Sequence, residues 1–242
     1  MAALEYTCVV TSFRMITPNV FELTFDPGAP VTFVAGQFVS IVVPGAGPSG
    51  RDIRRAYSIA SAPEVRPVEL CIKLVEEGPG TNYLYKLKVG DTFRGFAPYG
   101  TFTFVYKPAR HACFISTGTG VAPFRSMIMS KAYQDQKPLS TTCLLGVRDE
   151  SDLLYMDDFS KLPWVKWIPT VSRPSTAEWK GVRGRVTDYL RSLGNDYPWL
   201  ETDYYLCGGG GMIDEVKLIL AGKGVVKESM HQEVYYKEPK TT

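Results

Sequence analysis

The sequence predicts two folded domains, an antiparallel β-barrel followed by a parallel α/β domain. Over about the first hundred residues, apolar and polar side chains alternate with period two between glycine and proline breaks, which is typical of short antiparallel strands. After about Lys107, buried-looking strands alternate with helical segments, and this alternation indicates a doubly wound parallel sheet. The change of pattern at "VYKPAR" predicts domains at residues 1–107 and 108–242.

The strand segments of the first domain are short and closely spaced, which favours a closed barrel or a sandwich. They span residues 7–15, 20–25, 37–43, 56–60, 68–75, 91–96 and 100–105. In the second domain each strand precedes a helical pattern, as in βαβ units. The strands span residues 111–116, 141–147, 164–172 and 203–208, and the helical patterns span 123–134, 151–162, 185–193 and 212–222.

Composition limits the classes of function. A net charge of +2 provides no overall attraction to nucleic acid or an anionic membrane, so we expect neither as a partner. The closest pair of cysteines, Cys113 and Cys143, lies 30 positions apart, which excludes a CxxC pair, a zinc knuckle and a local iron–sulfur loop. With two histidines and no G-x-S-x-G motif, a hydrolytic triad and a metal site are not expected. No membrane span or signal peptide is apparent, which predicts a cytoplasmic protein.

A glycine-rich turn, "STGTGVAPFRSM", follows the strand 111–116 directly. Gly118 and Gly120 permit backbone conformations and close approaches that a Cβ would block, and Pro123 suits the first turn of a helix. Free amides at such a helix start form a seat for phosphate. The turn could equally be a plain strand-to-helix connection, because the third glycine of G-x-G-x-x-G is absent.

A second glycine cluster, "LCGGGGMID", repeats this arrangement after the strand 203–208. Ligands of open α/β sheets bind at the carboxyl ends of the strands, where both clusters would lie. On composition alone, Cys207 would be a small buried hydrophobic residue. The cation-rich loop after the strand 164–172 is either solvated surface or, through Ser172 and Arg173, a seat for a ribose phosphate.

These segments, in this order, resemble the ferredoxin–NADP reductase family over nearly the whole chain. The first domain carries "GQF", "RAYS", "CIKLV" and "GPGTNYL", and the second carries "GTGVAPF", "LLGVRDESDLLY", "VSR", "CGGGGM" and "EVY". The resemblance implies a six-stranded antiparallel FAD-binding barrel followed by a Rossmann-like parallel-sheet domain that binds NADP or NAD.

The resemblance also implies where the flavin binds. Arg55 would pair with the FAD pyrophosphate, Tyr57 would lie against the isoalloxazine ring, and Ser58 would hydrogen-bond near flavin N5. The implied flavin contacts are Arg55, Ala56, Tyr57, Ser58, Ile72, Lys73, Leu74, Gly80, Thr81 and Asn82. Period two places Tyr57 and Ser58 on opposite faces, so this stretch must be a ligand-facing strand end, and Arg54 is interpreted as surface.

For the nicotinamide dinucleotide, the resemblance implies contacts from both glycine turns and from the cationic loop. These contacts are Thr117, Gly118, Thr119, Gly120, Pro123, Arg148, Ser172, Arg173, Cys207, Gly208 and Met212. Ser58, Cys207 and Glu233 are the implied catalytic residues. Either Tyr235 or Tyr236 would cover the other flavin face, and this choice stays open because the chain continues beyond both.

The implied activity is hydride transfer between NAD(P)H and FAD, with single electrons passing to or from a separate carrier such as ferredoxin or flavodoxin. One alternative is an NADH-dependent reductase component of an oxygenase or other multi-subunit redox complex. Another is a non-catalytic flavin- or nucleotide-binding regulatory module. Ser172 and Arg173 favour NADPH, but Pro174 after them also fits NADH-using relatives. The sequence does not predict the electron acceptor, the physiological direction or the oligomeric state.

Overall fold

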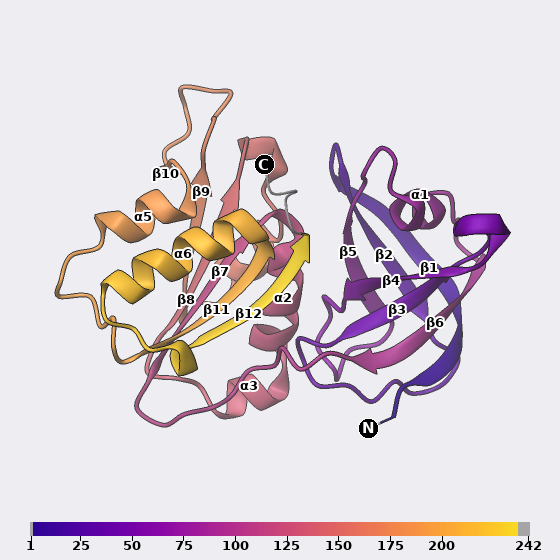
Figure 1. The fold of residues 1–242 in the computed structure, drawn as a ribbon, viewed down its shortest axis with the longest axis horizontal. Helices are drawn as coiled ribbons and strands as arrows, with labels where there is room; N and C mark the ends of the chain where they lie inside the picture. Colours follow the sequence, from indigo (N-terminus) through magenta and orange to yellow (C-terminus); the bar gives the residue numbers. More distant parts are fainter. Residues whose placement is uncertain (1, 237–242) are drawn as a thin grey trace. The chain divides into compact units, whose positions relative to one another are not determined.

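The computed structural model describes residues 2–236, which form two compact units (Figure 1). The first unit comprises Met1–Phe104 and Ala122–Asp135, and the second comprises Val105–Val121 and Gln136–Thr242. Each unit contains one six-stranded sheet, antiparallel in the first and parallel in the second, which confirms the predicted fold class. The units are not two continuous stretches of chain, because residues 122–135 group with the barrel. The predicted domain boundary at residue 107 therefore stays a prediction.

The antiparallel sheet closes into a barrel. Its strands are β1 (Leu4–Thr17), β2 (Val20–Asp26), β3 (Phe38–Val43), β4 (Ile53–Ser58), β5 (Val68–Lys73) and β6 (Thr92–Tyr99). They lie in the order β4-β3-β6-β1-β2-β5, and a bridge between Ile59 and Leu70 joins the two ends. This unit also holds η1 (Pro48–Gly50), α1 (Pro79–Tyr85), α3 (Lys131–Asp135) and α2 (Val121–Met129) except for its first residue.

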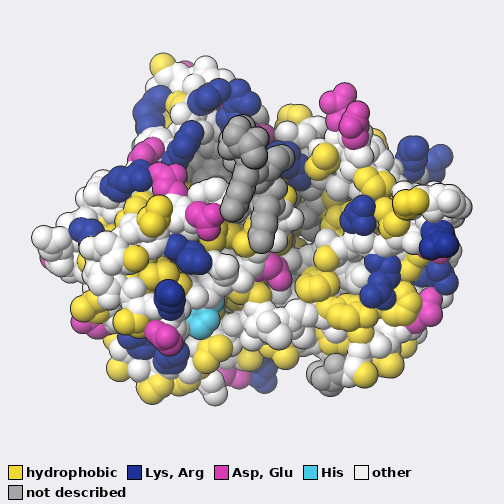
Figure 2. Space-filling model, in the orientation of Figure 1, with side chains coloured by type: hydrophobic (Ala, Val, Ile, Leu, Met, Phe, Trp, Pro, Cys, Tyr) yellow, Lys and Arg dark blue, Asp and Glu magenta, His cyan; other side chains and the backbone are white. Residues whose placement is uncertain are grey.

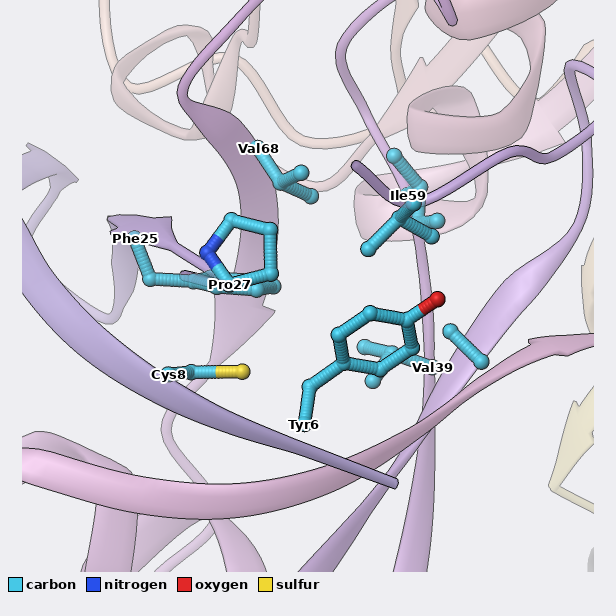
Figure 3. A pocket seen from close by; sticks show the side chains of 9 residues that line it. Tyr6, Cys8, Phe25, Pro27, Val39, Ile59 and Val68 are labelled. Carbon is cyan, nitrogen blue, oxygen red and sulfur yellow. The ribbon is translucent and has the colours of Figure 1, made fainter. Parts of the chain in front are cut away.

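Alternating side chains of the strands fill the barrel interior, as the period-two pattern predicts. The packing leaves an apolar cavity of about 10 Å³, lined by residues such as Tyr6, Cys8 and Ile59 (Figure 3). A space of this size holds at most one water, which needs several polar partners, and the exposed lining of this cavity is apolar. The cavity is therefore a packing defect and not a ligand site.

One predicted barrel strand, 100–105, is wrong. Residues 101–107 form no regular structure, although their aromatic side chains alternate. Phe102 packs against Phe124 of α2 with ring centroids 6.0 Å apart, and Phe104 packs against Tyr133 of α3 at 4.4 Å. The alternation thus reflects packing against helices, because burial of every second side chain does not require a neighbouring strand.

The parallel sheet has the strand order β10-β9-β8-β7-β11-β12. Its strands are β7 (His111–Thr117), β8 (Thr141–Val147), β9 (Val165–Val171), β10 (Val182–Arg183), β11 (Thr202–Gly209) and β12 (Met230–Tyr236). The helices are α4 (Met156–Ser160), α5 (Val186–Ser192) and α6 (Gly210–Gly222), with short turns η2 (Gly118–Gly120), η3 (Glu150–Asp152) and η4 (Lys227–Ser229). Helices α5 and α6 lie side by side over one face of the sheet (Figure 1). The order reverses between β7 and β11, and such a switch point is where dinucleotides bind.

All five cysteines are buried and unpaired by disulfides. Burial raises the thiol pKa of Cys8 and of Cys113 to about 12, and it raises those of Cys143 and Cys207 well above their ordinary value. Because the thiolate is the nucleophile, we expect the native protein at pH 8 to react with a disulfide reagent such as DTNB at less than about 1% of its rate in denaturant. Absorbance at fixed time points checks this, and a rapidly reacting thiol in the native protein would contradict it.

Candidate functional site

The predicted nucleotide-binding residues gather at the carboxyl edge of the parallel sheet. Neighbouring strands β9, β8, β7 and β11 end there at Val171, Val147, Thr117 and Gly209. The segments that follow these ends carry Ser172 and Arg173, Arg148, and the first glycine turn, while Cys207 and Gly208 are the two residues before the last residue of strand β11. The structure thus brings together side chains and turns that are up to 91 residues apart, counted from residue 117 to residue 208.

The two glycine turns approach each other more closely than side chains would permit. A Cβ on Gly120 would overlap the carbonyl oxygen of Cys207 and lie 2.7 Å from its carbonyl carbon. Gly208 has a φ of +145°, and a Cβ there would overlap the Thr117 hydroxyl. These turns therefore keep backbone amides, and not side chains, at the switch point, which suits a flat or phosphate-bearing ligand.

Cys207 lies at the base of this arrangement. Its Cα partners across the sheet are Ser116 on β7 and Glu233 on β12. Burial raises its pKa well above the ordinary value and the charge of Glu233 adds to that effect, while a hydrogen bond from the Tyr235 side chain acts in the opposite direction. At neutral pH the residue is therefore a neutral thiol, small and unreactive.

Both candidate covering tyrosines come from β12 and lie near the end of β11. The Tyr235 side chain hydrogen-bonds to Cys207, and the Tyr236 hydroxyl lies 2.8 Å from the position that a Cβ of Gly209 would take. Tyr236 is the more exposed of the two, at 60% against 37% for Tyr235. Which of them covers the flavin stays a prediction.

Hydrogen bonds join the ends of β8 and β9. The N–H groups of Ser172 and Arg173 donate to the carbonyl oxygens of Val147 and Arg148, at 3.1 and 2.7 Å. The Ser172 hydroxyl also donates to Val147, so its position is fixed by the sheet. Both arginines are exposed, and their backbones are held side by side. Lys and Arg side chains gather over this part of the second unit (Figure 2, upper left).

In the first unit, the start of α1 lies against β4. A Cβ on Gly80 would overlap the Tyr57 hydroxyl and lie 2.8 Å from Cγ of Arg55. Arg55 and Tyr57 therefore share the face that covers this helix start, as period two predicts. Burial raises the pKa of Tyr57 to about 12, against the opposing effect of the Arg55 charge, so its hydroxyl stays protonated. The cationic Arg55, which is exposed, and the first-turn amides of α1 can together hold an anion.

The side chains of Thr81 and Asn82 fix a loop instead of pointing outward. The Thr81 hydroxyl accepts a hydrogen bond from the Val75 N–H, and the Asn82 amide donates to the carbonyl oxygens of Val75, Glu76 and Gly78 at 2.9 to 3.0 Å. Any contact from Thr81 to a pyrophosphate would therefore come from its backbone, whereas the Asn82 N–H donates to the Gly78 carbonyl oxygen at 3.0 Å. Their role stays a prediction.

The β5 segment presents its predicted flavin contacts in different ways. Ile72 is 1% exposed and belongs to the barrel core, so only its backbone can meet a ligand. Lys73 is exposed, and Leu74 packs on the core while its N–H donates to the Asn19 carbonyl oxygen at 2.8 Å. The lysine is the residue of this segment whose side chain is available to solvent.

Tyr57 and Ser58, which period two places on opposite faces of the strand, lie where β4 ends and the chain changes its partner strand. Ser58 is the last residue of the strand and pairs with Phe38 of β3, whereas the next residue, Ile59, bridges to Leu70 of β5. The chain changes partner there, so the stretch is a strand end, as expected. Arg54 is exposed, but it is not a free surface side chain, because its guanidinium lies 4.9 Å from the centroid of the Phe96 ring.

Sequence reasoning missed the residues that hold this strand end in place. Arg125 of α2 donates to the Ala60 carbonyl oxygen at 3.0 Å and forms an ion pair with Glu69 at 2.5 Å. The Ser126 hydroxyl donates to the Ser61 carbonyl oxygen at 2.7 Å. A charged residue within the apolar helical pattern 123–134 was the available signal, but its partner is 56 residues away.

Two family descriptions match the chain, one over each part. "Oxidoreductase FAD-binding domain" matches residues 7–104, and "Oxidoreductase NAD-binding domain" matches residues 114–217. Ferredoxin–NADP reductase B of Sorangium cellulosum (strain So ce56) is 33% identical over 238 residues, which cover 93% of this chain and 96% of that relative. The electron transfer component of xylene/toluene monooxygenase from Pseudomonas putida is 26% identical over 99% of this chain and 68% of its own length.

Solved structures agree with this assignment of the fold. A ferredoxin NADP⁺ reductase from Neisseria gonorrhoeae with bound FAD and NADP superposes with a TM-score of 0.80 at 19% identity, covering 98% of this chain and 100% of that one. Among residues 2–236, no helix is long and apolar enough to cross a membrane. The chain belongs to the ferredoxin–NADP reductase family, whose members are oxidoreductases that bind FAD and a nicotinamide dinucleotide and transfer a hydride between them.

Proposed function

We propose that this enzyme oxidises NADPH and passes electrons singly to a separate carrier protein such as ferredoxin or flavodoxin. The proposal rests on the 33% sequence identity, along almost the whole of both chains, with a relative named ferredoxin–NADP reductase. FAD supplies the exchange between two-electron and one-electron chemistry when it is bound. The protein supplies binding and orientation, and each of its two units has a site whose shape depends on glycine.

On the flavin side, Arg55 holds the pyrophosphate together with the first-turn amides of α1. The absence of a Cβ at Gly80 supports this, because any side chain there would meet Arg55 and Tyr57. Tyr57 offers a protonated phenol and a flat apolar ring to the isoalloxazine. We assign Ser58, which precedes the partner change at Ile59, to the N5 edge of the flavin. Ala56, Lys73 and the backbone of Ile72 complete this surface.

On the nicotinamide side, residues 117–120 hold the dinucleotide pyrophosphate with their amides, and Pro123 and Met212 flank the two turns. Cys207 and Gly208 leave room for the nicotinamide ring, since one is a buried neutral thiol and the other has no side chain. Glu233 lies beside Cys207 in the sheet. Ser172, Arg173 and Arg148 hold the 2′-phosphate, for which exposed guanidinium groups on adjacent backbones are suited.

A second candidate is an NADH-dependent reductase component of an oxygenase. The sequence similarity to an oxygenase electron transfer component, 26% identity along 99% of this chain, favours this candidate. Pro174 after Arg173 also favours it, because that pattern fits NADH-using relatives. A pull-down that recovers a fixed oxygenase subunit would favour this candidate over a diffusible carrier.

Anaerobic stopped-flow reduction with NADPH and NADH separately tests the proposal. We expect the yellow holoenzyme to bleach with both nucleotides, and faster with NADPH at equal low concentrations. Faster bleaching with NADH would overturn the NADPH assignment. No bleaching with either nucleotide would overturn the proposed reaction and leave a non-catalytic flavin-binding module.

Arg55→Ala is expected to weaken FAD retention. The guanidinium forms a charge-assisted pair with the pyrophosphate, and its loss is worth roughly 1.5 to 3 kcal/mol, or about 10- to 150-fold in FAD dissociation constant. Flavin fluorescence during titration of the apoprotein measures this constant. Arg54→Ala is the matched control, because Arg54 lies over Phe96 on the other face of the strand; equal losses in both variants would contradict the assigned role.

A further inference from the structure

The carboxylate of Glu150 holds the loop that carries the predicted 2′-phosphate residues. Glu150 begins η3, two residues beyond Arg148 after the end of β8, and accepts hydrogen bonds from the loop that follows β9. The Ser175 N–H donates to its Oε2 at 2.9 Å, and the N–H and hydroxyl of Thr176 donate to its Oε1 at 2.9 and 2.6 Å. Both carboxylate oxygens are therefore occupied by one exposed loop.

Glu150 is itself held on a fixed support. The side chain of Asp149 accepts a hydrogen bond from the Ser151 N–H at 3.0 Å, and the Asp149 N–H donates to the Asp152 carboxylate at 3.3 Å, which forms a capping box around η3. Because β8 is an inner strand of the sheet, this turn is anchored to the core of the second unit. The carboxylate thus connects a rigid turn to a polar loop.

The connected loop leads directly to the cationic side chains. Arg173 lies two residues before Ser175, and its N–H already donates to the Arg148 carbonyl oxygen at 2.7 Å. The hydrogen bonds from Ser175 and Thr176 extend this contact, so the chain on both sides of Pro174 is fixed relative to β8. Further along, Arg183 donates to the carbonyl oxygens of Ala177 and Trp179 at 3.2 Å. An exposed polar loop of this kind would otherwise have many conformations.

We propose that Glu150 is a positioning residue for dinucleotide selection, which fixes Arg173 beside Arg148 and thereby strengthens binding of the 2′-phosphate of NADPH. This rests on the proposed function. Glu150 does not touch the phosphate. It acts through the loop, by lowering the number of conformations that Arg173 must give up when the phosphate binds.

Charge alone predicts the opposite effect, so the sign of the result is informative. A carboxylate near a phosphate site repels the phosphate, and its removal would tighten binding of NADPH. The loop contacts predict that its removal weakens binding. The hydrogen bond from Thr176, with those from the backbone, lowers the Glu150 pKa to about 2, so the carboxylate stays ionised above about pH 4 and its effect should not vary between pH 6 and pH 9.

Calorimetric titration of the FAD-loaded enzyme with 2′,5′-ADP and with 5′-AMP, which differ only in the 2′-phosphate, tests the proposal. In Glu150→Ala we expect the dissociation constant of 2′,5′-ADP to rise about tenfold, equivalent to losing one or two exposed hydrogen bonds, and that of 5′-AMP to change less than twofold. In steady-state kinetics KM for NADPH should rise with kcat unchanged. Glu150→Gln can keep the oxygen that accepts both hydrogen bonds from Thr176 but turns an N–H₂ group toward the Ser175 N–H, so it should recover part of the affinity. Glu178→Ala removes an exposed carboxylate from the same loop and should change nothing.

The outcomes separate the two levels of the proposal. If the unmodified enzyme binds 2′,5′-ADP no more tightly than 5′-AMP, the proposed NADPH preference fails. If it does prefer 2′,5′-ADP but Glu150→Ala retains or improves that preference, the role of Glu150 is overturned. Equal weakening toward both probes would also overturn it, because that result indicates a general loss of structure.

Discussion

Gly120→Ala is expected to lower kcat/KM for NADPH about 100-fold while leaving FAD bound. A Cβ at this position would overlap the carbonyl oxygen of Cys207, so one of the two glycine turns must move. The atoms it meets belong to the backbone of β11, an inner strand of the sheet, and cannot rotate away as a side chain can. A displacement of about 1 Å at a dinucleotide site is enough for a 100-fold loss. Stopped-flow reduction at several NADPH concentrations, with flavin content measured by absorbance, checks both parts.

Gly222→Ala provides the matched control. Gly222 is the last residue of α6, and a Cβ there has no heavy atom within 4 Å. This variant should keep full activity and gain up to about 1 kcal/mol of stability, because alanine loses less conformational freedom in a helix than glycine does. Normal kcat/KM in Gly120→Ala would show that the two turns need not touch during turnover.

The order of the elements followed from local patterns, because burial of alternate side chains and helical periodicity are properties of neighbouring residues. The same patterns give a wrong prediction where alternate side chains are buried against helices and not within a sheet. The alternation of Phe102 and Phe104 resembles a strand, but these rings pack on helices. The patterns also fail to predict α1, β10 and β12. Helix α1 begins within "GPGTNYL" and β12 contains the "EVY" motif, both of which the resemblance assigns to ligand binding, and β10 has only two residues.

The positions of the candidate site residues followed from the motifs, but their supports did not. A parallel sheet brings the ends of β7 and β11 together whatever their separation in sequence, so the two glycine turns could be placed at one edge. The contacts of Arg125 with Glu69 and of Glu150 with Thr176 join residues 56 and 26 positions apart. No local pattern encodes such pairs, because they depend on which surface side chains the folded backbone brings within hydrogen-bond distance.

Asp203→Asn is expected to destabilise the second unit by about 3 kcal/mol. Asp203 lies in β11 with its side chain 4% exposed, and its carboxylate receives Lys107 Nζ at 2.9 Å and Arg110 Nε at 2.8 Å. Asparagine would leave both cations without their charged partner and would turn an N–H₂ group toward one of them. Breaking a buried pair costs about 3 to 5 kcal/mol, and partial exposure of Lys107 and Arg110 favours the lower end.

Tryptophan fluorescence during urea unfolding measures this loss, because all four tryptophans of the chain, Trp164, Trp167, Trp179 and Trp199, belong to the second unit. Asp214→Asn, at an exposed position of α6, should change the free energy of unfolding by less than about 0.5 kcal/mol.

The same carboxylate should give this unit a pH dependence that Asp203→Asn lacks. Burial acts to raise the pKa of Asp203, but the hydrogen bonds and charges of Arg110 and Lys107 outweigh it and lower the pKa below the usual value. A lowered carboxyl pKa stabilises the folded state above about pH 4, the unfolded value, and that stabilisation disappears as the pH falls through the folded pKa. Below about pH 4 the unmodified protein should therefore lose stability more steeply than Asp203→Asn. Parallel slopes in the two proteins would show that other carboxylates dominate acid unfolding of this unit.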